Sequence, residues 1–164
     1  MFKLLLTILI ASCIASPAMS QQESQAVLNA YRDGLFDIAT DDVAQATTNF
    51  QYVVAYGTTA KYRLAGRVQL ATISLDSGSY ANAISHADSA LTSADATNPE
   101  TYRWQVRAYQ VKAAAQSLSG DATSANTTRQ AGITHLEPLV SSDAIAPLYL
   151  AIANELAELG DHAG

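Results

Sequence analysis

The chain has 164 residues, of which 49% are hydrophobic and 15% are charged, and this balance excludes an intrinsically disordered protein. Its formal net charge is −6, and an acidic domain is poorly suited to bind nucleic acid or anionic lipid. The single cysteine, Cys13, excludes a disulfide framework, so a hydrophobic core must hold the protein together.

Residues 1–20 have the pattern of an export signal. Lys3 gives a short positive start, residues 4–15 form an apolar run, Pro17 ends that run, and small residues precede the expected cleavage after Ser20. A membrane-spanning helix needs about 20 apolar residues, and this run has about 12. We therefore predict a cleaved signal peptide and a mature protein that is periplasmic or secreted, with no stable membrane insertion after cleavage.

A second N-terminal interpretation stays open. Residues 10–13 read Ile-Ala-Ser-Cys, which resembles a bacterial lipobox and would make Cys13 the acylated first residue of a membrane-anchored lipoprotein. The apolar run continues beyond Cys13, and this continuation favours the soluble form over the lipoprotein.

The mature domain, residues 21–164, has a helical pattern throughout. No stretch alternates apolar and polar residues for long enough to form a convincing strand. Glycine and Asx residues stand at the ends of the apolar-periodic runs, where helices begin and end. These signals predict seven helices, near residues 22–39, 41–56, 59–77, 79–94, 99–119, 121–140 and 143–159. Because the connections are short, successive helices form antiparallel αα-hairpins.

The predicted hairpins share a register of small and aromatic residues. In the second hairpin, Ala71 lies in the first helix, Gly78 lies in the turn, Tyr80 follows, and Ala83 lies at the expected helix contact. In the first hairpin, Gly34 takes the small position of the first helix, and Ala46 and Phe50 lie in the second helix. In the third hairpin, Ala113 takes the small position, Gly120 lies in the turn and Ala125 lies in the second helix.

This register resembles the tetratricopeptide repeat, in which a small residue of helix A packs closely against an alanine of helix B. The hairpins are longer than the usual repeat of about 34 residues, and Ala30 and Arg67 stand where a tryptophan is usual. The resemblance implies an all-α fold of antiparallel αα-hairpins stacked as a short right-handed solenoid. The repeats would lie near residues 27–60, 64–97 and 106–139, with a capping helix at 143–159.

The fifth predicted helix, residues 99–119, favours this solenoid over a plain helical bundle because it is apolar on two sides. A helix stacked between two neighbours needs two apolar faces. One face carries Trp104, Ala108, Val111, Ala115 and Leu118, and the other carries Tyr102, Val106, Tyr109 and Ala113.

The sequence contains no recognisable catalytic or metal-binding motif. His86, His135 and His162 lie on different elements, and none has the spacing of a zinc site. Asp88 and Ser89 follow His86 on one helix and point in different directions, so the three cannot form a catalytic triad. We therefore expect no enzymatic activity, no metal and no cofactor.

Basic residues are concentrated on the first helices of the hairpins, where every cation of the mature domain except Arg129 falls. In the family that the chain resembles, the first helices line a concave groove. The groove residues that we predict are Tyr31, Leu35, Val68, Thr72, Arg103, Arg107 and Gln110. Arginine and glutamine would bind backbone carbonyls or an acidic side chain of a peptide, and the tyrosine would stack on it.

The resemblance implies a non-enzymatic interaction scaffold in the bacterial cell envelope, similar to small periplasmic tetratricopeptide proteins. Its partner would be a protein or peptide segment and not nucleic acid. The alternative is a periplasmic helical bundle that binds a small molecule or metal between its helices. The bundle predicts a closed internal pocket in place of an open groove.

Overall fold

The computed structural model describes residues 22–95, 97–143, 146–147 and 150, and all regular structure within them is helical. The helices are α1 (Gln25–Ala39), α2 (Val43–Tyr56), α3 (Ala60–Asp76), α4 (Tyr80–Thr92), α5 (Tyr102–Leu118) and α6 (Ala122–Leu136), with the short 3₁₀ helix η1 (Pro99–Thr101) before α5. Six expected helices are thus confirmed. The predicted signal peptide and most of the predicted capping helix lie outside the described residues.

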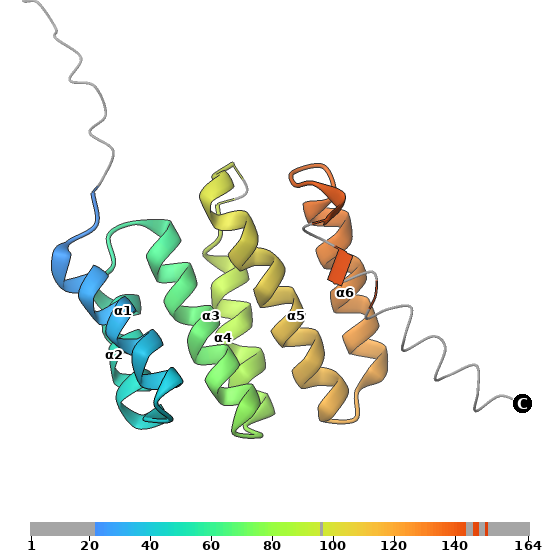
Figure 1. Ribbon diagram of the computed structural model, residues 1–164. Coiled ribbons are helices and arrows are strands. Elements are labelled where there is room, and N and C mark those ends of the chain that lie inside the picture. The colour runs from blue at the N-terminus through green and yellow to red at the C-terminus, as the bar shows by residue number, and fades with distance from the viewer. Residues whose placement is uncertain (1–21, 96, 144–145, 148–149, 151–164) are drawn as a thin grey trace, which may run out of the picture.

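The six helices form three hairpins that stand side by side (Figure 1). α1 packs on α2, α3 on α4, and α5 on α6, while α3 also contacts α2 and α5, and α4 contacts α5. The first helices of the second and third hairpins, α3 and α5, therefore each lie between neighbouring helices. This position explains why each of them needs two apolar faces. This row of hairpins is the expected all-α solenoid, and it does not favour a bundle around a closed pocket.

Local capping groups determine where the helices begin and end. The side chains of Ser24, Asp42 and Asp121 accept hydrogen bonds from the first turns of α1, α2 and α6, which satisfies donors that the helix leaves free. Gly78 and Gly120 follow α3 and α5 with φ of 73° and 90°, a left-handed conformation that favours glycine.

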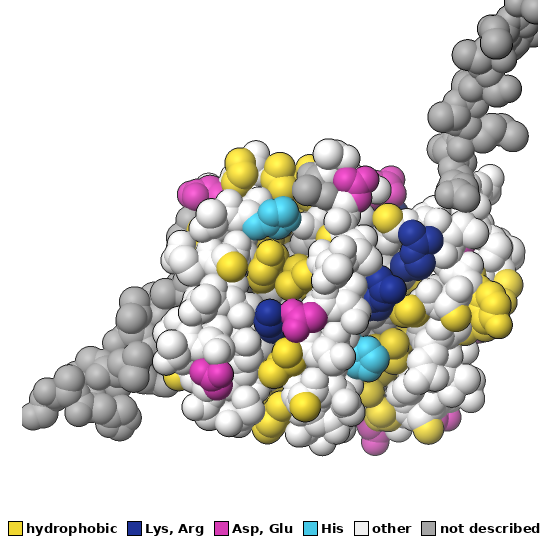
Figure 2. Space-filling view, turned by 180° about the vertical axis from the view of Figure 1, so that it is seen from behind, with side chains coloured by type: hydrophobic (Ala, Val, Ile, Leu, Met, Phe, Trp, Pro, Cys, Tyr) yellow, Lys and Arg dark blue, Asp and Glu magenta, His cyan; other side chains and the backbone are white. Residues whose placement is uncertain are grey.

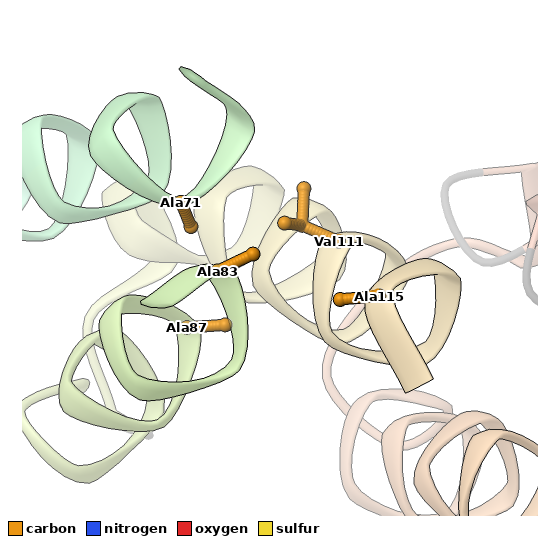
Figure 3. Close-up of a cluster of buried hydrophobic side chains, with 5 residues drawn as sticks. All are labelled: Ala71, Ala83, Ala87, Val111 and Ala115. Atoms are coloured by element: carbon orange, nitrogen blue, oxygen red, sulfur yellow. The ribbon is translucent and has the colours of Figure 1, made fainter. Parts of the chain in front are cut away.

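Alanine allows the second and third hairpins to approach closely. Ala71 of α3, Ala83 and Ala87 of α4, and Val111 and Ala115 of α5 form one buried cluster where the three helices meet (Figure 3). Each of these side chains is at most 1% exposed. Short side chains at such a contact let the helix backbones pack closely.

In the first hairpin, Gly34 has the corresponding role. A Cβ atom at Gly34 would lie 2.9 Å from Cζ of Phe50, so α1 and α2 pack around the phenyl ring only because Gly34 has no side chain.

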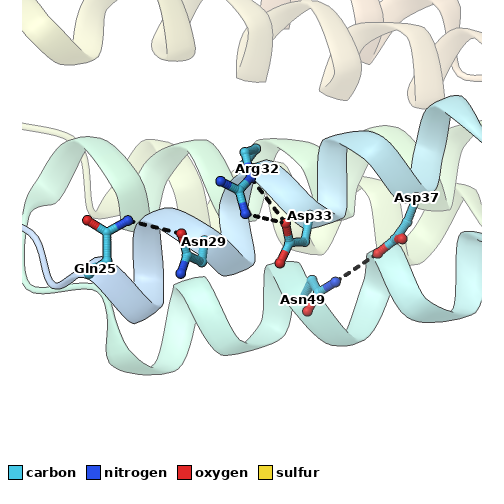
Figure 4. Close-up of polar contacts among 6 residues, drawn as sticks. All are labelled: Gln25, Asn29, Arg32, Asp33, Asp37 and Asn49. Carbon is cyan, nitrogen blue, oxygen red and sulfur yellow. Dashed lines mark hydrogen bonds and ion pairs between the residues drawn. The ribbon is translucent and has the colours of Figure 1, made fainter.

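Polar side chains form contacts along α1 and between α1 and α2 (Figure 4). Gln25 donates a hydrogen bond to Asn29 at 3.0 Å, Arg32 pairs with Asp33 at 3.0 Å, and Asn49 of α2 donates to Asp37 at 2.7 Å. The same hairpin also exposes large hydrophobic side chains, with Phe36 67% and Tyr56 63% exposed.

Candidate functional site

Three aromatic side chains meet on the surface formed by the first helices α1, α3 and α5, which we call the inner face. The ring centroid of Tyr31 lies 5.5 Å from that of Tyr62 and 6.3 Å from that of Trp104, in edge-to-face geometry. Tyr31 belongs to α1 and Trp104 to α5, so the first and third hairpins touch across α3. Side chains of α1 and α5, the helices on either side of α3, thus meet over α3. This arrangement requires the surface to curve inward, so the inner face is concave. We call these three residues the aromatic cluster.

Arg103 lies over the aromatic cluster. Its guanidinium carbon is 4.6 Å from the centre of the Trp104 ring, the geometry of a cation–π contact. Burial raises the pKa of the Tyr31 hydroxyl above its usual value. The nearby Gln69 side chain and the charge of Arg103 offset this rise only in part. The indole Nε1 of Trp104 is buried and has no hydrogen-bond partner within the described residues. Lys61 also lies near the cluster, with its Nζ 5.8 Å from the centre of the Tyr62 ring. The cluster therefore combines aromatic surface with positive charge, of which Arg103 is the exposed part.

An open cavity of about 440 Å³ lies beside the cluster, between the C-terminal parts of α1 and α3 and the start of α2. We call it the inner pocket. Its apolar wall includes Leu35, Ile38 and Val43, which are 40%, 39% and 44% exposed. The remaining lining residues are Asp41, Gln69, Thr72, Ile73, Asp76 and Ser77. Gln69 lines the pocket and also lies close enough to Tyr31 to affect the pKa of its hydroxyl, so the pocket and the cluster are adjacent parts of one surface.

Most predicted groove residues lie on the inner face. Tyr31 is in the aromatic cluster, Arg103 covers it, and Leu35 and Thr72 line the inner pocket. Arg107 is exposed and Gln110 is half-buried on α5. Their spacing from Arg103 is that of residues on the same side of a helix. These three residues form the α5 edge of the candidate site.

Val68 does not line the groove. It is 1% exposed and packs in a core cluster with Leu64, Ala90 and Ala108. The pocket-lining side of α3 is centred near Gln69 and Asp76, about a quarter of a helical turn from Val68. Because α3 is apolar on two sides, sequence spacing alone could not tell which side faces the groove and which faces α4 and α5.

Three of the basic residues on the first helices are also absent from the inner face. Arg63 donates to the carbonyls of Gly57 and Thr58, both at 3.0 Å, and Arg67 donates to the Ser89 carbonyl of α4 at 3.2 Å. Lys112 pairs with Asp88 of α4 at 2.8 Å. Figure 2 shows the reverse face, where a few basic side chains lie on a mostly uncharged surface and one lies against an acidic side chain. These cations tie neighbouring elements together.

Neither of the histidines that the structure describes, His86 and His135, lies in a metal site. His86 is half-buried, and burial lowers the pKa of its imidazole. Nε2 of His135 lies 2.9 Å from Oε1 of the buried Gln105. Across the part of the chain that the structure describes, no three His, Cys, Asp or Glu side chains gather as a metal site would require, and no helix has the length and hydropathy to cross a membrane.

Sequence reasoning missed several residues of the site. Tyr62, Gln69 and Asp76 are spaced seven apart on α3, which places them on one side of the helix. That spacing could have indicated the inner face of α3. Nothing comparable in the sequence places Ile38 and Val43 beside them, since that contact requires the turn between α1 and α2.

Comparison with solved structures gives one informative likeness. The chain is similar to the crystal structure of a TPR-like protein from Chlorobium tepidum TLS, with a TM-score of 0.63 and 16% sequence identity. The likeness covers 82% of this chain and 94% of that one. The chain therefore has a TPR-like fold. No protein-family model matches the sequence, and no curated protein matches it either. The TPR-like assignment therefore describes the fold and not the function.

Proposed function

We propose that this TPR-like protein is a non-enzymatic scaffold that holds a segment of a partner protein on its inner face. Solenoids of this kind commonly present a concave surface for protein binding. The observation that carries the proposal is the inner pocket, because Leu35, Ile38 and Val43 leave aliphatic surface open within a concave surface. Aliphatic side chains in a concave site favour the burial of a partner's apolar side chain.

Polar groups beside the pocket would position the partner. Arg103 is held over Trp104 but remains exposed, as does Arg107, so both guanidinium groups are free to meet backbone carbonyls or a carboxylate of the bound segment. Gln110 adds a side-chain amide to the same edge. We therefore assign positioning to this edge of α5 and anchoring to the inner pocket.

We further propose that the scaffold acts in the bacterial cell envelope. The support is the export-signal pattern of residues 1–20, with cleavage after Ser20. A periplasmic protein would begin at Gln21, whereas the lipoprotein form would begin at an acylated Cys13 and act at a membrane surface.

Affinity capture of the tagged protein after crosslinking in its host tests the scaffold. Mass spectrometry of the envelope fraction identifies the partner and the mature N-terminus. We expect the variant Arg103→Ala/Arg107→Ala to recover roughly tenfold less partner, the scale expected when charged contacts at an interface are lost. The melting temperature should change little, because both side chains are exposed.

The matched control is Arg32→Ala/Lys112→Ala, which removes the same charge outside the inner face. Arg32 pairs with the neighbouring Asp33, and Lys112 pairs with Asp88. Equal partner recovery from both double variants, or the absence of any specific partner, would contradict the scaffold proposal. A mature chain starting at Gln21 supports the periplasmic form, and a lipidated Cys13 would overturn it.

A further inference from the structure

The inner pocket has an acidic rim. Its lining includes the carboxylates of Asp41 and Asp76 together with the aliphatic side chains of Leu35, Ile38 and Val43. Among the described residues that line it, none is a lysine, arginine or histidine. The pocket therefore differs in charge from the α5 edge of the inner face, where Arg103 and Arg107 lie.

Within the described part of the chain, neither rim carboxylate has an ion-pair partner. The cations found elsewhere on the first helices have their own contacts: Lys61 pairs with Glu100, Lys112 with Asp88, and Arg67 with the Ser89 carbonyl. The negative charge at the pocket is thus left uncompensated by the fold.

The backbone conformation at each of the two carboxylates is well defined. Asp76 is the last residue of α3. Asp41 lies in the turn after α1 with a φ of 63°, and its N–H donates to the Ile38 carbonyl at 3.2 Å. Aspartate and asparagine tolerate this left-handed conformation better than most other residues. Asparagine at position 41 can therefore remove the charge without disturbing the turn.

We propose that the inner pocket receives an aliphatic side chain of a partner segment that carries a lysine or arginine beside it. This inference rests on the proposed scaffold function and names the partner's chemistry. An aliphatic side chain matches the apolar wall, and an adjacent cation pairs with Asp41 or Asp76 as their water is displaced. A neutral or acidic segment would desolvate these carboxylates without compensation.

Charge also separates this partner from a second copy of the chain. The protein carries a formal net charge of −6, so two copies repel one another. A basic segment is attracted by the same charge, and its binding weakens as salt screens that attraction. The pocket is therefore assigned to a segment of a different, locally basic protein.

Selection from a random dodecapeptide phage library tests the assignment. We expect peptides selected by the wild-type protein to contain an aliphatic residue next to lysine or arginine. The affinity of a synthetic selected peptide, measured by fluorescence polarisation, should fall roughly tenfold in Asp41→Asn/Asp76→Asn, as loss of close charge pairs at an interface predicts. Added sodium chloride should weaken the wild-type complex in the same direction.

The matched control is Asp33→Asn/Asp143→Asn, which removes two exposed carboxylates outside the pocket and should leave the affinity within about twofold, because separated surface charges are screened. Thermal melts of both double variants verify that they fold. Selected peptides without cation enrichment, no selected peptide at all, or equal affinities for the two variants would each overturn the pocket assignment.

The outcomes also separate this inference from the scaffold proposal. If the peptide selection fails but envelope capture still depends on Arg103 and Arg107, the scaffold stands and the basic-partner assignment is wrong. If neither experiment yields a partner, both proposals are wrong.

Discussion

Glu23 precedes α1 and is only 8% exposed. Its carboxylate accepts hydrogen bonds from the backbone N–H and the hydroxyl of both Thr58 and Thr59, at 2.9–3.1 Å. Burial by itself raises the pKa of Glu23, but these bonds and one from the N–H of Ser24 lower it from 4.5 to about 2. A single carboxylate thus ties the start of the described domain to the loop before α3.

Glu23→Gln should lower the free energy of unfolding at neutral pH by about 1–3 kcal/mol, since hydrogen bonds to a charged group are lost and buried donors lose their partner. The folded-state pKa of about 2 lies below the unfolded value of 4.5. The contribution is therefore fully present above pH 4.5 and is lost as the pH falls toward 2.

Urea unfolding of the wild type and the variant across this pH range measures the effect, with the exposed Glu100→Gln as the control. The difference between wild type and Glu23→Gln should shrink as the pH falls. A difference that stays constant from neutral pH to pH 2 would show that the charge of Glu23 contributes nothing.

Helix packing depends on a few very small side chains. Ala83 is fully buried where α4 meets α3 and α5, and Gly34 leaves room for Phe50 between α1 and α2. At these contacts the helix backbones approach so closely that a longer side chain has no space. Interhelical distance in this solenoid is therefore controlled by residues that contribute little apolar surface themselves.

Ala83→Leu should overpack this contact and lower the free energy of unfolding by about 1–3 kcal/mol. Ala81→Leu makes the same chemical change on the same helix at an exposed position and should stay within about 0.5 kcal/mol of the wild type. Chemical denaturation monitored by circular dichroism compares the two variants. Equal stabilities would mean that α4 does not pack through Ala83.

On the scale of the whole molecule, the aromatic cluster joins hairpins that are not neighbours in the sequence. Tyr31 of the first hairpin reaches Trp104 of the third, with ring centroids 6.3 Å apart, and α3 lies between them. The chain contains one tryptophan, so tryptophan fluorescence reports on the surroundings of Trp104, which include this long-range contact.

Tyr31→Ala should shift the emission of Trp104 to longer wavelength and increase its quenching by acrylamide, because the indole loses cover from the first hairpin. Loss of the edge-to-face pairs should also lower the free energy of unfolding by at least about 1 kcal/mol. Tyr56→Ala removes an exposed tyrosine of α2 and should leave the emission unchanged. An unchanged spectrum in a folded Tyr31→Ala protein would contradict the contact.

The sequence alone predicted the helical class, six described helices and their hairpin order. Gly78 and Gly120 were recognisable as turns, because a left-handed backbone conformation depends on residues within about one helical turn. Alanine at positions 71 and 83 indicated close helix contacts for the same local reason, since small side chains permit close approach. The structure places Tyr31, Leu35, Thr72 and Arg103 on the inner face, and their role in binding stays a prediction.

Tertiary structure decided which side of each helix faces which neighbour. Val68 and Thr72 are one turn apart on α3, yet Val68 is in the core and Thr72 lines the inner pocket. The sequence also did not predict that Arg67 of α3 donates a hydrogen bond to the Ser89 carbonyl of α4. Nor did it predict the contact between Tyr31 and Trp104. A helix with two apolar sides has no local signal that distinguishes them, and only the stacking of all three hairpins determines which side remains open.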